Sequence, residues 1–180
     1  MSDIIKTEAV VLSKINYGDT SSIVSLYTKS DGKLSAIVKG GRGPKSKIGK
    51  IIDPLNHLQV IIYKKTTRDV QILSDANLIS HFVNTKEDLD ATRYSFAIIE
   101  LVKNLTSEHE TNSKLFQGVI KILNMIDEKK EAPAFLFGRF LLFFLSELGY
   151  EISIDKCAIC GNDVVANRSL GFDFNTGLIC

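Results

Sequence analysis

The hydrophobic pattern of the chain changes near residue 80. Before this point, apolar and β-branched residues form short runs separated by turn-forming residues, which is typical of β-strands. The five strands that we expect are Ala9–Leu12, Ser22–Tyr27, Leu34–Val38, Leu58–Tyr63 and Val70–Leu73. Five short strands of this kind favour a small OB-fold barrel. Asp31-Gly32, between the second and third strands, is typical of a type I′ hairpin turn, in which two residues have positive φ.

From about Glu87 the apolar residues instead recur every three or four positions, as they do on one face of a helix. Two such stripes run from Tyr94 to Leu105 and from Leu115 to Ile126. A third helix, from about Pro133 to Leu148, is apolar nearly all round, and we expect it at the centre of its domain. Strands followed by helices, without alternation, indicate an α+β protein with segregated parts.

We therefore expect two domains. An OB-fold domain covers residues 1–80, and a helical domain covers residues 81–180, with a CxxC segment at 151–180. The chain of 180 residues is 44% hydrophobic and can bury a substantial core. No basic segment followed by an apolar run begins the chain, and the longest apolar stretch, Ala134–Leu145, is shorter than the roughly 20 residues that cross a bilayer. We expect a cytoplasmic protein without a membrane segment.

Positive charge is concentrated in one segment, although the net charge of the whole chain is only +1. Residues 1–80 carry 12 Lys or Arg and 7 Asp or Glu, whereas residues 81–180 carry 10 and 14. The candidate ligands for DNA phosphates are Lys33, Lys39, Arg42, Lys45, Lys47 and Lys50. The pattern predicts a mobile basic loop that neutralises phosphates, and the alternative is an ordinary solvated lysine-rich loop.

Other chemistry has weaker support. The segment 39–47 is rich in glycine, but Pro44 stands where a P-loop has the glycine before Lys-Ser, and proline removes an amide donor that would bind phosphate. Tyr17, Tyr27 and Tyr63 are the aromatic residues before residue 80, and each either packs in the barrel or stacks on a base. The three histidines lie in unrelated contexts and no Gly-x-Ser-x-Gly motif occurs, so the sequence predicts no enzyme.

Three cysteines near the end of the sequence have the spacing of zinc ligands. Cys157 and Cys160 form a CxxC knuckle, and Cys180 follows after 19 intervening residues. A β-like return over Leu170–Ile179 fits a zinc ribbon, in which the metal is structural. Such a zinc ion needs four ligands, and the fourth is not identified in this chain. The alternatives are a redox-active CxxC, for which the preceding βαβ pattern is missing, and three ordinary thiols.

A long N-terminal stretch carries a family resemblance. From Glu8 the chain reads EAVVLSKINYGDTSSIVSLYTKSDGKLSAIVKGGRGPKSK, which resembles the N-terminal domain of the bacterial recombination mediator family RecO. The similarity continues through Asp53-Pro54, Arg139-Phe140, Leu148-Gly149-Tyr150 and the CxxC knuckle. One departure is that Asp19 follows Gly18 where the family usually has Glu. Family members also usually continue beyond this length, with a fourth cysteine soon after the third.

The resemblance implies a function and a set of partners. It implies a non-catalytic, nucleoid-associated protein that binds single- and double-stranded DNA and anneals strands. It also implies that the protein acts together with RecR and with single-stranded-DNA-binding protein (SSB) to load RecA. A second class of function stays open, namely an interaction adaptor whose basic loop binds an acidic protein partner.

Arg139 is the one cation in the third expected helix. The resemblance implies that the helical domain receives the acidic, aromatic-ended C-terminal tail of SSB, and a guanidinium beside an apolar groove suits its terminal carboxylate. Arg139 is therefore a candidate ligand for that tail. The alternative is that Arg139 reaches the surface or pairs with a nearby acid such as Glu100 or Glu147.

Overall fold

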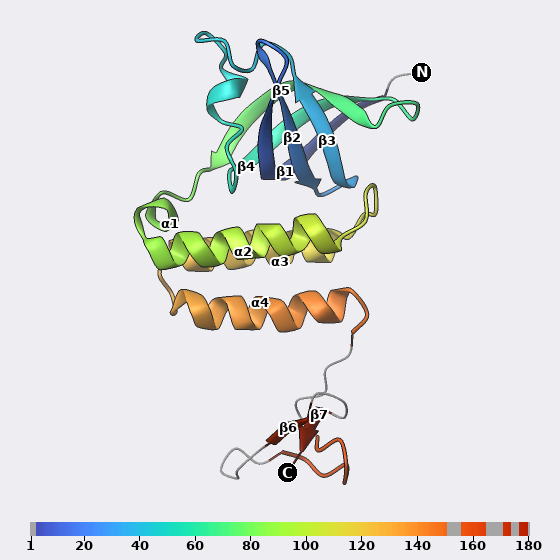
Figure 1. Ribbon diagram of the computed structural model, residues 1–180, viewed down its shortest axis with the longest axis vertical. Coiled ribbons are helices and arrows are strands. Elements are labelled where there is room, and N and C mark those ends of the chain that lie inside the picture. Colours follow the sequence, from blue (N-terminus) through green and yellow to red (C-terminus); the bar gives the residue numbers. More distant parts are fainter. Residues whose placement is uncertain (1–2, 151–155, 165–170, 174–176, 180) are drawn as a thin grey trace. The chain divides into compact units, whose positions relative to one another are not determined.

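Five strands form a closed barrel in the N-terminal part of the chain (Figure 1). The computed structural model describes residues 3–150, 156–164, 171–173 and 177–179. The strands are β1 (Asp3–Tyr17), β2 (Ser21–Thr28), β3 (Gly32–Val38), β4 (His57–Lys64) and β5 (Val70–Ser80). Their order around the barrel is β1-β2-β3-β5-β4, and only the β3–β5 pair is parallel among the paired strands described. The predicted α+β class with an OB-like barrel is confirmed, as are all five strands.

Alternation along each strand separates the core of the barrel from its outer surface. In β3, Leu34, Ala36 and Val38 are buried, while the residues between them are partly exposed. β1 is 15 residues long, much longer than the predicted Ala9–Leu12, because its first half pairs with β4 and its second half with β2. Outward-facing polar residues such as Ser13 interrupt the apolar run, so the hydrophobic pattern does not indicate the full length of β1.

The β2–β3 turn has a different geometry from the predicted one. Gly32 has a φ of 61°, but Asp31 is not among the residues with positive φ, so the type I′ prediction is wrong. The hairpin itself is confirmed, since Thr28 pairs with Gly32. Thr28 Oγ1 accepts a hydrogen bond from the Asp31 N–H (3.0 Å) and so closes the turn without a second residue of positive φ.

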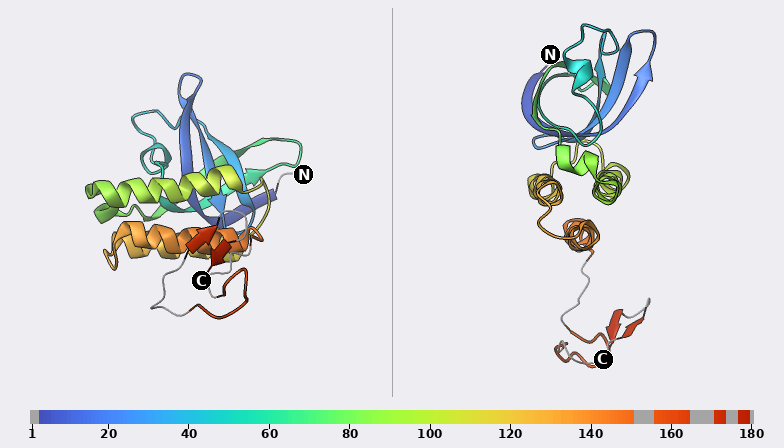
Figure 2. Two further views of the ribbon diagram at one scale, coloured as in Figure 1. Left: turned by 60° about the horizontal axis from the view of Figure 1, so that its bottom comes forward. Right: turned by 90° about the vertical axis from the view of Figure 1, so that its left-hand side faces the viewer.

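Four helices follow the barrel in the described part of the chain. They are α1 (Val83–Glu87), α2 (Leu89–Leu105), α3 (Ser113–Asp127) and α4 (Pro133–Glu147). The three long helices confirm the predicted periodicity, whereas α1 was not predicted. Side chains cap the starts of two of them: Asp88 accepts a hydrogen bond from Ala91 N–H, and Asn112 accepts one from Leu115 N–H. Figures 1 and 2 show α2 and α3 side by side on one side of the barrel.

The last helix is not buried all round. Phe135 is 60% exposed and Leu142 is 42% exposed, so the prediction of an entirely buried central helix is wrong at these positions. The chain divides into two compact units, Met1–Phe140 and Leu141–Cys180, and the division falls inside α4. The barrel and the first three helices thus belong to one unit, and the predicted domain boundary near residue 80 stays a prediction.

The second unit contains a small antiparallel sheet. β6 (Gly171–Asp173) pairs with β7 (Gly177–Ile179), which confirms the β-like return for the described residues. No helix in the described residues is long and apolar enough to cross a membrane.

Candidate nucleic-acid interface

The basic loop, residues 39–50, is a folded segment that ends in the 3-10 helix η1 (Ile48–Lys50). Backbone hydrogen bonds close successive turns within it. Gly49 packs so tightly on Gly41 that a Cβ atom on Gly49 would lie 1.7 Å from the Gly41 carbonyl oxygen. Ile51, which follows the loop, packs against the barrel core. The loop is thus held by its own turns and by the barrel, and its predicted mobility stays a prediction. In Figures 1 and 2 it lies on the side of the barrel away from α2 and α3.

Arg42 joins the basic loop to the β1–β2 turn. Its Nη2 atom donates hydrogen bonds to the carbonyl oxygens of Gly18 (2.6 Å) and Asp19. Its backbone N–H donates to the carbonyl oxygen of Thr20 (2.8 Å). Arg42 thus has a structural role, and its predicted contact with phosphate stays a prediction.

Lys33 faces helix α2 instead of the basic loop. Its Nζ donates to the carbonyl oxygens of Lys103 (2.8 Å) and Thr106 (2.5 Å), at the C-terminal end of α2. A cation at this end of a helix compensates carbonyl groups that have no intrahelical partner. The structure therefore does not bring Lys33 together with the other predicted phosphate ligands.

The four remaining candidates are exposed and have no partner in the part of the protein that the structure describes. They are Lys39, Lys45, Lys47 and Lys50. Within the described residues, none of their ammonium groups makes an ion pair or a hydrogen bond. Asp53, an acid that follows the loop, is already bound by Lys14 Nζ at 3.0 Å. Exposed cations on a folded loop can neutralise phosphates without first breaking contacts of their own.

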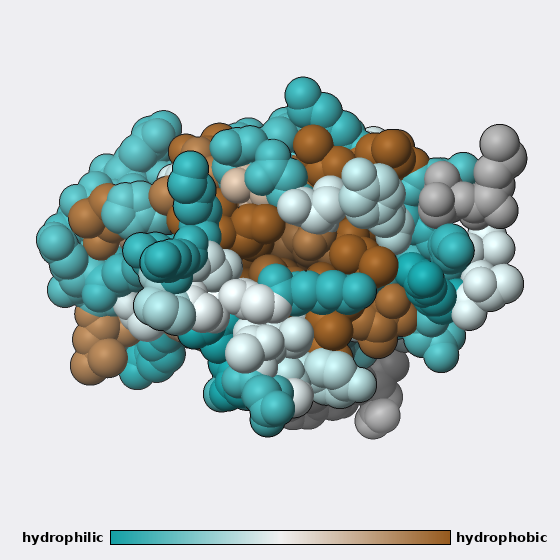
Figure 3. Space-filling view, turned by 90° about the horizontal axis from the view of Figure 1, so that it is seen from above, coloured by the Kyte–Doolittle hydropathy of each residue, from teal (hydrophilic) through white to brown (hydrophobic). Residues whose placement is uncertain are grey.

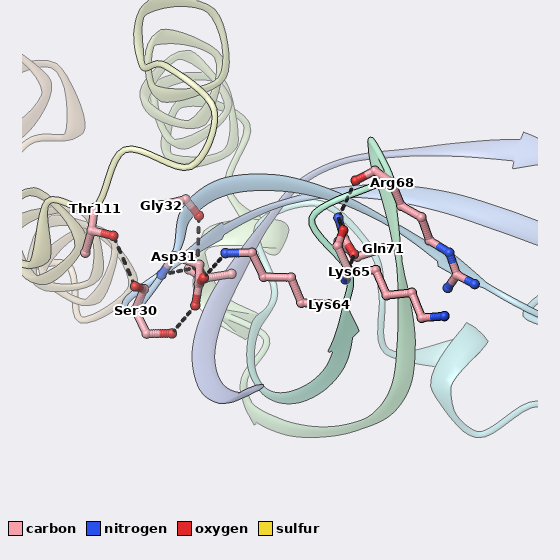
Figure 4. A network of polar contacts seen from close by, with 9 residues as sticks. Ser30, Asp31, Gly32, Lys64, Lys65, Arg68, Gln71 and Thr111 are labelled. Carbon is pink, nitrogen blue, oxygen red and sulfur yellow. Dashed lines mark hydrogen bonds and ion pairs between the residues drawn. The ribbon is translucent and has the colours of Figure 1, made fainter. Parts of the chain in front are cut away.

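A second basic segment, the β4–β5 turn (residues 65–69), was missed in the sequence. Gln71, which is only 1% exposed, organises this turn: its Nε2 donates to Arg68 O (2.6 Å) and its Oε1 accepts from Lys65 N–H (2.8 Å). Figure 4 shows these bonds, with the Lys65 and Arg68 side chains extending away from the turn. The sequence does contain a signal for this segment, the run Lys64-Lys65-Thr66-Thr67-Arg68 between two predicted strands. The sequence analysis considered only the larger group of cations at 39–50.

Lys64 differs from these neighbours because it is bound. Its Nζ lies 2.5 Å from Asp31 Oδ1, and Asp31 also accepts a hydrogen bond from Ser30 Oγ (2.8 Å). Thr111, between α2 and α3, donates from Oγ1 to Ser30 O (3.1 Å). Figure 4 shows how this chain of contacts joins β4, the β2–β3 turn and the helical layer. Lys64 therefore supports the fold and is not a candidate phosphate ligand.

A buried histidine lies where the barrel meets α3. His57 is 5% exposed, its Nε2 lies 3.1 Å from Glu8 Oε2, and its ring meets the Phe116 ring edge-on at 6.2 Å between centroids. Burial lowers the pKa of His57 below its ordinary value of 6.5, and the carboxylate of Glu8 partly opposes this shift. At neutral pH His57 is thus uncharged and donates its proton in the hydrogen bond to Glu8.

Beside this histidine, a groove of about 560 Å³ runs between the barrel and α3. Its lining combines apolar side chains with three ammonium groups and one carboxylate. These residues include Phe116, Ile120, Met125, Lys29, Lys121, Lys130 and Glu8. This combination suits an anionic ligand that also has an apolar part.

Arg139 reaches the surface of α4 and pairs with Glu131. Its Nη1 lies 2.9 Å from Glu131 Oε1, and the two side chains are 53% and 36% exposed. The predicted partners Glu100 and Glu147 were therefore wrong, because the acid that precedes the helix is the one within reach. An exposed ion pair of this kind contributes about 0 to 1 kcal/mol.

The three tyrosines of the barrel divide between core and surface. Tyr27 is 1% exposed and lies against Phe116, so it is a packing residue. Tyr17 is 55% exposed and Tyr63 is 40% exposed. Only these last two can present a ring to a ligand.

The CxxC segment forms a tight knuckle in the second unit. The N–H of Gly161 donates to Cys157 O (2.9 Å), and Gly161 has a φ of 72° that suits glycine. The N–H of Cys157 donates to Asn162 O (2.9 Å). Cys157 is buried and Cys160 is exposed. The backbone turn between the two cysteines is thus closed, as it is in a zinc knuckle.

The knuckle lies next to β7. The N–H of Ala158 donates to Leu178 O (2.7 Å), and Leu178 is two positions before Cys180 in the sequence. Cys180, the third predicted zinc ligand, lies outside the described residues. Among the described residues no group of three or more His, Cys, Asp or Glu side chains could hold a metal ion.

The fold places the chain in a class of α+β proteins that carry an OB-like barrel followed by a helical layer. Two family profiles match within this architecture. "Recombination protein O N terminal" matches residues 1–82, and "Recombination protein O C terminal" matches residues 86–173. The chain belongs to the RecO family of DNA repair and recombination proteins, as the resemblance predicted.

Relatives support the same assignment. DNA repair protein RecO of Chlorobium limicola is 38% identical over an alignment of 180 positions, which covers 97% of this chain and 69% of that protein. The RecO proteins of Chlorobium luteolum and Chlorobium phaeobacteroides are each 36% identical, over 93% and 89% of this chain and 64% and 62% of their own lengths. The chain thus spans between three fifths and seven tenths of these three relatives.

Proposed function

We propose that this protein is a non-catalytic recombination mediator that binds single- and double-stranded DNA, anneals strands and, with RecR, helps to load RecA on SSB-coated DNA. The family supplies the role in DNA repair. The observation that carries DNA binding is the basic loop, whose exposed lysines have no partner among the described residues. The turns of the loop fix the backbone positions from which these lysines extend.

Salt dependence tests this proposal. A variant with Lys39, Lys45, Lys47 and Lys50 all changed to Ala should bind oligonucleotides more weakly, with a salt slope of log affinity that is flatter by about 3. The matched control changes Lys114, Lys121, Lys129 and Lys130 to Ala and so removes the same charge from α3 and the residues that follow it. A basic-loop variant with wild-type affinity and slope, or an equal loss in the control, would contradict the proposal.

An acidic protein partner is the alternative ligand of the basic loop. Either ligand would lose affinity when the lysines are removed, so competition separates the two. If DNA is the ligand, an unlabelled oligonucleotide displaces the labelled one, whereas an acidic polypeptide of equal charge displaces it only at a much higher concentration. If the wild-type protein binds no oligonucleotide at low salt, the adaptor function is the better account.

We also propose a structural zinc ion held by Cys157, Cys160 and Cys180. The closed knuckle and the bond from Ala158 to β7 support this proposal, because they join the backbone of the CxxC turn to the strand that precedes Cys180 in the sequence. Bound zinc would stabilise a segment with few apolar residues of its own. We expect metal analysis of the purified protein to find zinc and the Cys157→Ser variant to lose it, and a metal-free wild-type protein would contradict the proposal.

For the C-terminal tail of SSB, we propose Arg139 as the ligand of the terminal carboxylate. The exposed guanidinium supports this role, although the tail must displace Glu131. The lysine-lined groove between the barrel and α3 is the second candidate place. Titration of a tail peptide against Arg139→Ala and Lys121→Ala separates the two. Substitution of the residue that binds the carboxylate should weaken peptide binding about tenfold or more. If the Arg139→Ala variant binds the peptide as tightly as the wild-type protein does, Arg139 is not that residue.

A further inference from the structure

The outward face of α2 combines apolar and charged side chains. Five residues spaced alternately by four and three positions share this face, because an α-helix turns once about every 3.6 residues. They are Leu89, Arg93, Phe96, Glu100 and Lys103, and we call them the outer face of α2. All five are exposed, whereas the buried residues of the helix, such as Ile98 and Val102, lie on the opposite face. The outer face thus points away from the side on which α2 packs.

Two members of the outer face of α2 are large apolar residues. Leu89 is 83% exposed and Phe96 is 43% exposed. An aromatic ring exposed on a helix commonly contacts another protein. Figure 3, which views the molecule from the side of the basic loop, shows that apolar residues also gather elsewhere on the surface. Exposure alone therefore does not identify an interface, and the charges beside Phe96 are needed to identify the partner.

The charges on either side of Phe96 have opposite signs. Arg93 precedes Phe96 by three residues, and Glu100 follows it by four. Arg93 Nη2 lies 3.0 Å from Asp90 Oδ1 on the same helix, but these side chains are 64% and 66% exposed, and such a pair is weak. Glu100 makes no ion pair or hydrogen bond with any residue that the structure describes. A cation and an anion about equally far from an apolar centre are complementary to the same face of a reversed copy.

A groove of about 340 Å³ lies beside the outer face of α2. Its wall is apolar on α2 and on the first part of α4, and Glu100 and Asn104 are its polar residues. The apolar residues are Ala97, Leu101, Leu105 and Phe137. The Phe137 ring lies 5.5 Å from the Tyr94 ring between centroids, and this contact joins the first part of α4 to α2. An arginine suits such a groove, because its stem is apolar and its guanidinium binds a carboxylate.

We infer that the outer face of α2 is the contact surface of a symmetric dimer of this chain, in which the two α2 helices pack antiparallel. The twofold axis passes next to Phe96, so the two Phe96 rings meet across it. Arg93 of each copy then lies opposite Glu100 of the other, with its stem over the groove. Leu89 of each copy lies against the apolar stem of Lys103 of the other. A second copy is favoured over a different protein because one surface supplies both members of each contact.

This dimer is independent of the proposed DNA binding. In Figures 1 and 2, α2 and the basic loop lie on different sides of the barrel. Association through α2 therefore leaves the lysines of the basic loop exposed, and a failure of either proposal does not affect the other.

Sedimentation velocity of the purified protein, without DNA and over a series of micromolar concentrations, measures the dimer. The Phe96→Ser variant should raise the dimer dissociation constant about a hundredfold, because each dimer loses the aromatic contact at its centre from both copies. The matched control, Ile79→Ser, changes a residue that is 50% exposed on β5 and should leave the dissociation constant unchanged. A melting curve of each variant shows whether the fold is retained. A wild-type protein that stays monomeric at every concentration overturns the inference, and the outer face of α2 is then open to a different protein.

Charge reversal tests the antiparallel arrangement and does not depend on the Phe96 variant. Arg93→Glu and Glu100→Arg should each raise the dissociation constant about tenfold, because each places like charges together twice in the dimer. An equimolar mixture of these two variants should associate about as tightly as the wild-type protein, because every contact then joins a carboxylate and a guanidinium. A chain that carries both substitutions should do the same. If the mixture associates no better than either variant alone, the antiparallel arrangement is wrong and the inference is overturned.

Discussion

Lysines on the helix-facing side of the barrel are bound by protein groups, whereas those of the basic loop have no partner among the residues that the structure describes. Lys33 caps the end of α2, and Lys29 lies 3.2 Å from Glu8 beside the buried His57. In the basic loop, Lys45 and Lys47 are exposed and have no partner among the described residues. The same residue type therefore holds the helices to the barrel on one side and is available to a ligand on the other. A count of charges along the sequence does not distinguish these two uses.

Two glycines give the strongest contrast between the sides. Gly32 and Gly40 both have positive φ, 61° and 65°. A Cβ atom on Gly32 would lie 2.1 Å from Glu110 O, in the connection between α2 and α3, whereas one on Gly40 meets nothing within 4 Å. We expect Gly32→Ala to lower the free energy of unfolding by about 3 kcal/mol, from backbone strain and a clash with backbone, and Gly40→Ala by about 1 kcal/mol from strain alone. Urea denaturation measures both, and equal losses would mean that the helix contact adds nothing.

The fold could largely be predicted because its signals are local. Alternation marks the strands, and the three- to four-residue period marks α2 to α4. The errors have physical causes. β1 extends to Asp3 because its polar outward residues still pair with β4. α1 was missed because it is short and starts after Phe82, which has a φ of 47° that favours glycine.

The site could be predicted only in part, because the partners of each cation are distant in the sequence. Lys33 bonds to a carbonyl 70 residues away, and Arg42 to one 24 residues away. Neither contact has a signature in the pattern of residue types.

Substitution of one helix-facing lysine and of one lysine in the basic loop tests whether the first stabilises the fold and the second binds DNA. Lys33→Met should lower the free energy of unfolding by about 2 kcal/mol, because two carbonyl groups at the end of α2 lose a charged donor. Lys50→Met removes the same charge from an exposed position and should leave stability within about 0.5 kcal/mol of wild type while weakening DNA binding. Denaturation and oligonucleotide titration on both variants give four values. A reversed pattern, with Lys50 the stabilising residue, would contradict the comparison.

Arg42 differs from the lysines of the basic loop because its guanidinium binds protein carbonyl groups. Its substitution therefore tests whether a cation of this loop stabilises the fold or binds DNA. Arg42→Lys keeps the charge but cannot match the guanidinium that reaches both Gly18 and Asp19 carbonyls. We expect a loss of about 1 kcal/mol in the free energy of unfolding, with oligonucleotide affinity and its salt slope close to wild type. A large loss of affinity with unchanged stability would instead place the guanidinium on a phosphate.

The smallest expected effect is a dependence of stability on pH that arises from the helix-facing side. Burial lowers the pKa of His57 in the folded protein below the ordinary 6.5, so the unfolded chain takes up this proton first as pH falls. Between the two pKa values the unfolded state holds more protons, and the free energy of unfolding therefore decreases on acidification below about pH 6.5. His57→Gln should lose this part of the pH dependence, whatever its effect on stability at neutral pH. His81→Gln, at an exposed position, should keep it. Urea denaturation over a pH series measures the slopes, and a His57→Gln slope equal to that of the wild type would show that the proton on His57 is not coupled to folding.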